Sequence, residues 1–159
     1  MTQRRSRFSD ARGTSLVEAA LITPLLLFLT ISVVDFGLLF YAYRALENGV
    51  SQATRFAVTG NLIDDPANPG TPLSRTDSIK LAMRQSTPTL TIPDAAFTFN
   101  HMAPGGAAWV AGTGGPGEVE KVTVGYTWKF FNPMLWPFFA NGQITLKVDS
   151  AMKNESRFQ

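Results

Sequence analysis

The most constraining feature of the sequence is an apolar run from Leu16 to Tyr43, near the N-terminus. A bilayer core about 30 Å thick needs about 20 apolar residues in a helix. Residues 19–43 supply them with one internal charge, Asp35. A cleaved secretory signal has an apolar region of only about 7–15 residues and a small-residue cleavage site, neither of which fits this run. We therefore expect residues 14–43 to form a transmembrane helix.

Positive charge is concentrated ahead of this run. Residues 1–12 carry four arginines against one acid, whereas the rest of the chain is close to neutral and slightly acidic. The positive-inside rule then predicts a single-pass inner-membrane protein, with its N-terminus in the cytoplasm and its C-terminal domain periplasmic or extracellular. The folded part has no basic face suited to nucleic acid. The four arginines are Arg4, Arg5, Arg7 and Arg12.

Three residues within or beside the apolar run require a physical reason. Glu18 lies at its start, where the helix dipole favours a negative charge. Pro24 removes one helical hydrogen bond and predicts a kink. Asp35 follows Glu18 by ~25 Å along a helix, which places it close to the outer boundary of a bilayer. Its carboxylate would reach the headgroup layer or contact a partner, and both alternatives stay open.

The residues around Gly13 resemble the processing site of type IV prepilins. A basic leader ends in Gly13, Glu18 follows five residues later, and the apolar helix then begins. The downstream pattern is similar to that of the TadE-like family of the tight-adherence (Tad) pilus system. The resemblance covers residues 13–60 and, more loosely, 143–156, with Ala19 where an aromatic residue often follows the glutamate. The downstream residues that carry it are Ala20, Leu21, Pro24 to Leu27, Asp35, Phe36, Gly37, Phe40 and Tyr41.

This resemblance implies a structural role. A prepilin peptidase would cut after Gly13, remove the leader over residues 1–13, and leave Thr14 as the new N-terminus. Glu18 would pair with the N-terminal amine of a neighbouring subunit and set its register. The implied partners are the peptidase, the major pilin, a second pseudopilin and the inner-membrane assembly platform. The implied function is a minor pilin or pseudopilin that assembles, primes or tips a Tad-type pilus used in surface adherence.

Residues suited to catalysis are few. The chain has no cysteine and one histidine, His101, which excludes thiolate chemistry, disulfides and most structural zinc sites. The glycine-rich stretch 105–117 lacks the Lys-Ser/Thr pair and the following helix of a phosphate-binding loop. We therefore predict a protein that is not an enzyme and has no cofactor. An anchored hydrolase lacks converging acids, and the alternative function is an uncleaved single-pass anchor that presents a small extracytoplasmic binding domain.

The membrane helix is predicted to continue outside the bilayer over residues 44–60. Its apolar positions recur at spacings of three and four residues, which is typical of one helix face. These positions are Leu46, Val50, Ala53 and Ala57. Gly60 is a plausible end of this amphipathic half. A break at Gly49, followed by a short linker helix, is the alternative.

Residues 61–159 are predicted to form an extracytoplasmic, pilin-like α+β domain. A loop over 61–72 precedes a short helix over 77–86, capped by Thr76 or Asp77. Alternating apolar residues then predict a small, mostly antiparallel sheet packed against helix. The expected strands lie at 95–102, at 119–130 and from Ile144 onward, with Asn141-Gly142 as a turn before the last one. The apolar stretch Met134 to Phe139 is either a subunit or membrane contact or part of the core.

Overall fold

A computed structural model describes residues 10–158, with side chains described from residue 13 onward. The chain divides into two compact units, which are described separately. The first holds residues up to Leu38 together with Lys129–Gln143, and the second holds Leu39–Trp128 and the residues from Ile144 onward. Residues 1–9 of the predicted basic leader lie outside the described part, and only the backbone of residues 10–12 is described.

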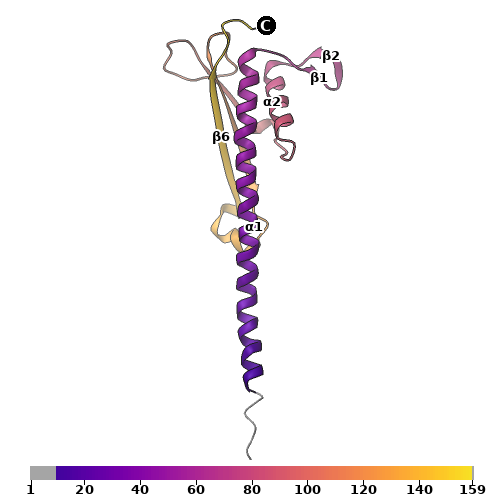
Figure 1. The fold of residues 1–159 in the computed structure, drawn as a ribbon. Coiled ribbons are helices and arrows are strands. Elements are labelled where there is room, and N and C mark those ends of the chain that lie inside the picture. The colour runs from indigo at the N-terminus through magenta and orange to yellow at the C-terminus, as the bar shows by residue number, and fades with distance from the viewer. Residues whose placement is uncertain (1–9, 159) are drawn as a thin grey trace, which may run out of the picture. The chain divides into compact units, whose positions relative to one another are not determined.

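The longest element is α1, Asp10–Thr59, which continues as a helix through Pro24 and Gly49 (Figure 1). Within the described residues it is the one helix long and apolar enough to cross a membrane. It ends where Gly60 takes a φ of 71°, a left-handed conformation that is common just after a helix and that glycine adopts without strain. The predicted long N-terminal helix is confirmed, whereas a kink at Pro24 stays a prediction.

Gly49 does not break α1, so the predicted linker-helix alternative is wrong. This glycine is buried, and a Cβ placed on it would lie 2.4 Å from Cγ2 of Thr87. The missing side chain therefore lets the segment after the second helix approach the α1 backbone closely. Close packing explains this residue, and the helix continues through it because the neighbouring residues supply an apolar face.

The second helix, α2, spans Arg75–Ser86 and starts two residues earlier than predicted. Its N-cap is Ser74, whose Oγ accepts a hydrogen bond from the backbone N–H of Asp77 at 3.1 Å. The predicted caps, Thr76 and Asp77, lie inside the helix because Ser74 already provides the acceptor that the first turn needs. The Ser74 hydroxyl in turn lies 2.6 Å from Oδ2 of Asp77, which reinforces this start.

The main sheet has four strands in the order β4-β3-β5-β6. Strand β3 pairs antiparallel with both β4 and β5. In the β3–β5 register, Phe97 lies opposite Val124 and Phe99 lies opposite Val122. The strands are β3 (Phe97–Met102), β4 (Val110–Ala111), β5 (Val119–Lys129) and β6 (Gln143–Lys153). The predicted α+β fold with an antiparallel sheet is confirmed.

A small two-stranded sheet occupies residues that were predicted as a loop. Strand β1 is Asp64–Asp65 and β2 is Asn68–Pro72. The turn between them is held by Asp65, which accepts hydrogen bonds from the Ala67 backbone at 2.9 Å and from the Asn68 side chain at 2.8 Å. Such short-range carboxylate contacts stabilise turns, and the proline-rich sequence concealed the pairing on either side.

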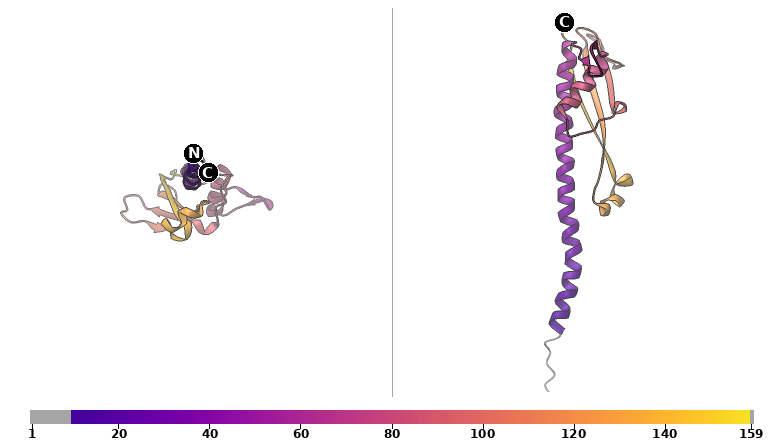
Figure 2. Two further views of the ribbon diagram at one scale, coloured as in Figure 1. Left: turned by 90° about the horizontal axis from the view of Figure 1, so that it is seen from below. Right: turned by 90° about the vertical axis from the view of Figure 1, so that its right-hand side faces the viewer.

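The core of the second unit lies between the second half of α1, the helix α2 and the sheet, as Figure 2 shows. The predicted face of α1 supplies four of its members, and α2 contributes Ile79 and Met83, which are fully buried. The sheet contributes alternating residues from both long strands, as expected. The core residues are Leu46, Val50, Ala53, Ala57, Ile79, Met83, Ile92, Phe97, Val122, Val124 and Val148.

We expect Gly49→Ala to destabilise the second unit, although the same change in an open helix stabilises by about 1 kcal/mol. The added Cβ would collide with Thr87 in a packed region, where overpacking costs about 1–3 kcal/mol. Urea unfolding of the full chain in detergent measures the effect. Gly37→Ala is the matched control, because nothing lies within 4 Å of a Cβ on Gly37. Thr87→Ser removes the colliding methyl and should restore stability to Gly49→Ala; no rescue would contradict the packing argument.

Candidate processing and assembly site

The residues of the predicted processing motif lie in the first turns of α1. Gly13, Thr14 and Glu18 are exposed, and nothing lies within 4 Å of a Cβ placed on Gly13. Among the described residues, no hydrogen bond or ion pair engages the Glu18 carboxylate. The motif is therefore accessible along one stretch of helix, and the fold itself gives no packing reason for a glycine at position 13.

The apolar side chains that surround Glu18 are also exposed. In the most hydrophobic stretch of this helix, no residue is buried. A surface of this size is rare in contact with water and marks contact with lipid or with another protein. Its members in the first unit include Leu16, Val17, Leu21, Ile22, Leu25, Leu26, Leu27, Leu29, Ile31, Val33, Val34, Phe36 and Leu38.

Asp35 is the exception in the part of α1 that belongs to the first unit, because it is only 1% exposed. Its Oδ2 accepts a hydrogen bond from the backbone N–H of Asn132 at 3.0 Å. The Asn132 side-chain amide donates to Oγ of Ser32 at 3.0 Å, one turn earlier on α1. The other oxygen of Asp35, Oδ1, has no hydrogen-bond partner among the described residues. The structure thus gives Asp35 a partner within its own chain, a third environment besides the headgroup layer and a separate partner.

The segment that covers Asp35 is residues 129–143, which we name the cap segment (Figure 1). Its Phe130 is buried and packs edge-on against Phe36 of α1, with ring centroids 5.6 Å apart, and stacks on Phe139 at 4.3 Å. Leu135 is also buried, whereas Met134 and Phe138 are exposed. Part of the apolar stretch therefore joins the core of the first unit, whereas its predicted role as a subunit or membrane contact stays a prediction for the exposed side chains.

Local sequence explains the shape of the cap segment. Asn132 caps the 3-10 helix η2 (Pro133–Phe138), because its Oδ1 accepts from the Met134 N–H at 3.1 Å and Pro133 has no N–H to satisfy. Asn141 and Gly142 take positive φ values of 54° and 66°, as the predicted Asn-Gly turn requires. The Asn-Pro pair is a helix-start signal, and it could have identified Asn132 as a structured residue.

A second buried carboxylate, Glu120, lies in the second unit. Its Oε2 accepts a hydrogen bond from the Gly114 N–H at 2.7 Å and pairs with Arg75 at 3.3 Å. Arg75 also donates to the carbonyl oxygens of Gly114 and Ala57 and lies 4.3 Å above the ring of Phe158. This cation therefore joins the end of α1, the glycine-rich loop and the C-terminal segment.

Burial raises the pKa of Glu120, and the Gly114 N–H and the Arg75 charge offset this only in part. Burial likewise lowers the pKa of Arg75, although Glu120 and Glu118 act in the opposite direction. Raised carboxylate pKa values occur in active sites, but structural ion pairs produce them as well. The partners of Arg75 are backbone carbonyls and an aromatic ring that close the fold, which favours a structural role.

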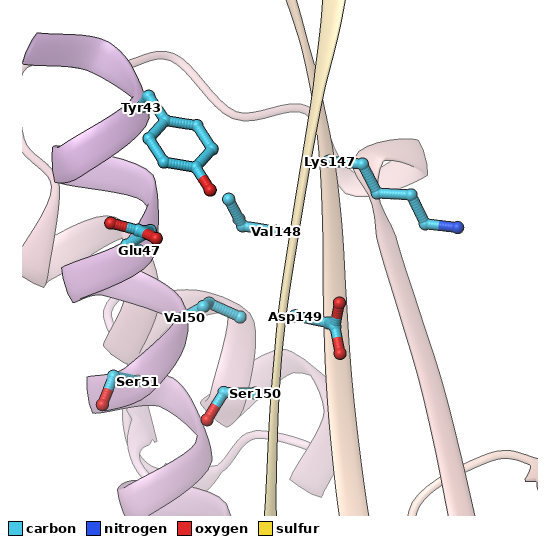
Figure 3. Close-up of a pocket in the computed structure, with 8 residues that line it drawn as sticks. All are labelled: Tyr43, Glu47, Val50, Ser51, Lys147, Val148, Asp149 and Ser150. Carbon is cyan, nitrogen blue, oxygen red and sulfur yellow. The ribbon is translucent and has the colours of Figure 1, made fainter. Parts of the chain in front are cut away.

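A groove of about 320 Å³ lies between α1 and β6 in the second unit (Figure 3). Figure 3 shows the Tyr43 hydroxyl directed toward Val148, while the Lys147 side chain and the Asp149 carboxylate point away from α1. Asp149 pairs instead with Lys121 at 3.5 Å. Lys147 and Asp149 therefore do not converge with Tyr43 and Glu47, the ionisable residues that α1 contributes to the groove. In the described part of the chain, no group of three or more acids and histidines is placed to hold a metal ion.

Comparison with known proteins bears on the N-terminal segment. Residues 13–55 match the model of a family described as TadE-like protein, which confirms the resemblance predicted from the sequence. Searches of curated proteins and of solved structures find no match. The match supports, in general terms, a membrane-anchored, pilin-like protein associated with a Tad-type pilus. The stretch 143–156 lies outside the matched residues.

We expect Asp35→Ala to loosen the cap segment. Losing the acceptor leaves the Asn132 N–H buried and unpaired, at a cost of about 1.5–3 kcal/mol, or ten- to a hundredfold in local opening. Hydrogen exchange of residues 129–143, measured by mass spectrometry on the full chain in nanodiscs, reports this opening. Asp35→Asn keeps an acceptor oxygen and should have a smaller effect, and Glu18→Ala is the control on the same helix. Wild-type exchange in Asp35→Ala would contradict this assignment.

We expect the stability of the second unit to depend on the protonation of Glu120. Because its pKa is raised on folding, the folded state holds the proton more tightly, and stability falls as the pH rises above the ordinary value near 4.5. Glu120→Gln mimics the protonated form, so its stability relative to wild type should increase as the pH rises. Unfolding in urea at pH 4, 6 and 8 tests this, with Glu155→Gln as an exposed control. A stability difference that does not change with pH would contradict it.

Proposed function

We propose that this chain is a minor pilin or pseudopilin, cleaved after Gly13, that assembles, primes or tips a Tad-type pilus. The observation that carries the proposal is the exposed carboxylate of Glu18, which has no hydrogen-bond or ion-pair partner among the described residues. It lies at the start of a long apolar helix, inside the segment that matches the TadE-like family. A charge in such surroundings needs a partner. No described residue of α1 supplies one, which supports a partner on another molecule.

The proposed partner of Glu18 is the N-terminal amine of a neighbouring pilin-like subunit. After cleavage the chain would start at Thr14, and its own amine would lie ~6 Å along the helix from Glu18. Opposite charges at this spacing fix the axial register of packed helices, because a shifted neighbour would leave a buried charge unpaired. The exposed apolar surface of α1 is suited to the same packing, first in lipid and then among sister helices.

Gly13 supports the processing step. It sits in a helix, where glycine costs about 1 kcal/mol relative to alanine, and no neighbour within 4 Å requires the missing Cβ. The fold therefore gains nothing from this glycine. A peptidase that binds the cleavage site in an extended form gains from it, because glycine both weakens the helix and fits a narrow subsite. The proposed partners are thus a prepilin peptidase, other pilin-like subunits and the inner-membrane assembly platform.

The proposed location is the inner membrane, with the N-terminus in the cytoplasm and the second unit outside, followed by incorporation in the pilus. The arginines before Gly13 support this orientation through the positive-inside rule. Cleavage would remove them, so that the processed chain is free to leave the bilayer. An uncleaved anchor would keep them and stay in the membrane, which is the difference that an experiment has to detect.

The direct test is N-terminal mass spectrometry of the chain from cells with and without the prepilin peptidase. We expect a start at Thr14 only when the peptidase is present, and a start at Met1 for Gly13→Phe, because the bulky ring does not fit the subsite. Gly13→Ala is the matched control, because it adds only a methyl group at the same position. A Met1 start in the presence of the peptidase would reject the proposal and favour the anchor.

Glu18 provides the second arm of this test. We expect Glu18→Gln to be cleaved normally but to reduce piliation strongly, since the amide cannot neutralise the amine of a neighbour. Asp35→Asn, on the same helix, controls for the loss of a carboxylate in the apolar segment. Normal piliation with Glu18→Gln would reject the register role while leaving cleavage after Gly13 intact.

A further inference from the structure

The solvent-exposed face of the cap segment is apolar and carries no acid. Phe131 and Phe138 are 70% and 76% exposed, and Met134 and Trp136 are exposed as well. Within residues 129–143 the only charged residue is Lys129, whose Nζ lies 5.4 Å from the ring centroid of Trp136. An apolar face with a single cation beside an indole ring is the composition of segments that bind at a membrane interface.

The attachment points of the cap segment fix its depth along α1. It is held to Ser32, Asp35 and Phe36 by the hydrogen bonds and the ring contact described above. Asp35 lies ~25 Å along the helix from Glu18, and the hydrocarbon core of a bilayer is ~30 Å thick. If Glu18 marks the inner boundary, the cap segment lies at the outer boundary, where the apolar surface of α1 is still exposed on neighbouring turns.

The backbone of the cap segment is suited to a site with little water. Irregular backbone survives at the membrane only where its polar groups are satisfied internally. Pro133 and Pro137 have no N–H, and the Trp136 indole donates to the Phe130 carbonyl at 3.0 Å. Other backbone N–H groups donate to acceptors within the cap segment or to Asp35. These donors are Phe130, Asn132, Met134, Leu135, Phe139 and Gly142.

We propose that the cap segment is a lipid-binding surface that inserts Phe131, Met134 and Phe138 into the outer leaflet of the bilayer that α1 crosses. Lys129 and Trp136 lie beside them at the level of the headgroups, where a cation meets phosphate and an indole meets the glycerol region. The contact fixes the depth of α1 and keeps lipid and water away from Asp35. It requires α1 to span a bilayer, but it requires neither cleavage after Gly13 nor assembly into a pilus.

The test uses the full chain in vesicles of phosphatidylcholine and phosphatidylglycerol. Because the sequence has no cysteine, Phe138→Cys introduces a unique thiol for the environment-sensitive fluorophore NBD. We expect blue-shifted emission and about threefold stronger quenching by lipids with a nitroxide on acyl carbon 5, the depth reached by interfacial apolar side chains. Leu62→Cys is the matched control, an exposed apolar residue of the second unit.

Met134→Cys is a second probe position, so that one altered side chain does not decide the result. Strong lipid quenching at both cap positions and weak quenching at Leu62 supports the proposal. Quenching at the cap no stronger than at Leu62 overturns it. Shielding from aqueous iodide without quenching by lipid nitroxide also overturns it, because a protein such as a second copy would then cover the face. None of these readouts changes if pilus assembly fails.

Discussion

Backbone hydrogen bonding within α1 is the constraint on which the rest of the structure depends. A helix satisfies its own N–H and C=O groups, so it can continue from lipid into a water-exposed unit without a change of conformation. Only the side-chain pattern changes along it. Up to Leu38 most of the large apolar residues are exposed, on every face of the helix. From Ala42 to Ala57 the buried residues instead follow one face. The first pattern suits lipid or sister helices, and the second provides the surface on which the sheet and α2 pack.

Buried charged side chains then connect loops to this helix through hydrogen bonds. In the first unit Asp35 holds the cap segment through the Asn132 N–H, and in the second unit Arg75 joins the Ala57 carbonyl to Glu120 and the glycine-rich loop. Each carboxylate accepts a backbone N–H and leaves one oxygen without a hydrogen bond among the described residues. Such contacts add little net stability because desolvation opposes them. Their effect is specificity, since a loop that slipped by one residue would leave a buried group unpaired.

The sequence was sufficient for features that repeat and insufficient for those that depend on long-range contacts. The length of α1, its buried face, the alternating strands and the Asn141-Gly142 turn all follow from local periodicity or turn chemistry. The sequence left a break at Gly49 open as an alternative, because the reason for this glycine is a contact with the Thr87 methyl, which is distant in sequence. The hydrogen bond of Asp35 could not be predicted, because its partner Asn132 lies far along the chain and shares no local pattern with it. The β1–β2 pair was missed because Asp65 forms a turn that proline-rich sequence does not reveal.

The two acids of the apolar segment consequently differ in what they require. Asp35 is satisfied in part by its own chain, and the cap segment excludes water and lipid from it. Glu18 is exposed and has no hydrogen-bond or ion-pair partner among the described residues, and Val17, Leu21 and Ile22 beside it on α1 are exposed as well. In a bilayer an isolated carboxylate stays near a boundary or finds a partner. In the proposed assembly, a neighbouring subunit would neutralise Glu18, while Asp35 would keep its contact with the cap segment. Under the proposed function, Glu18 at the start of the helix would set intermolecular register, whereas Asp35 in its middle holds the cap segment within the chain.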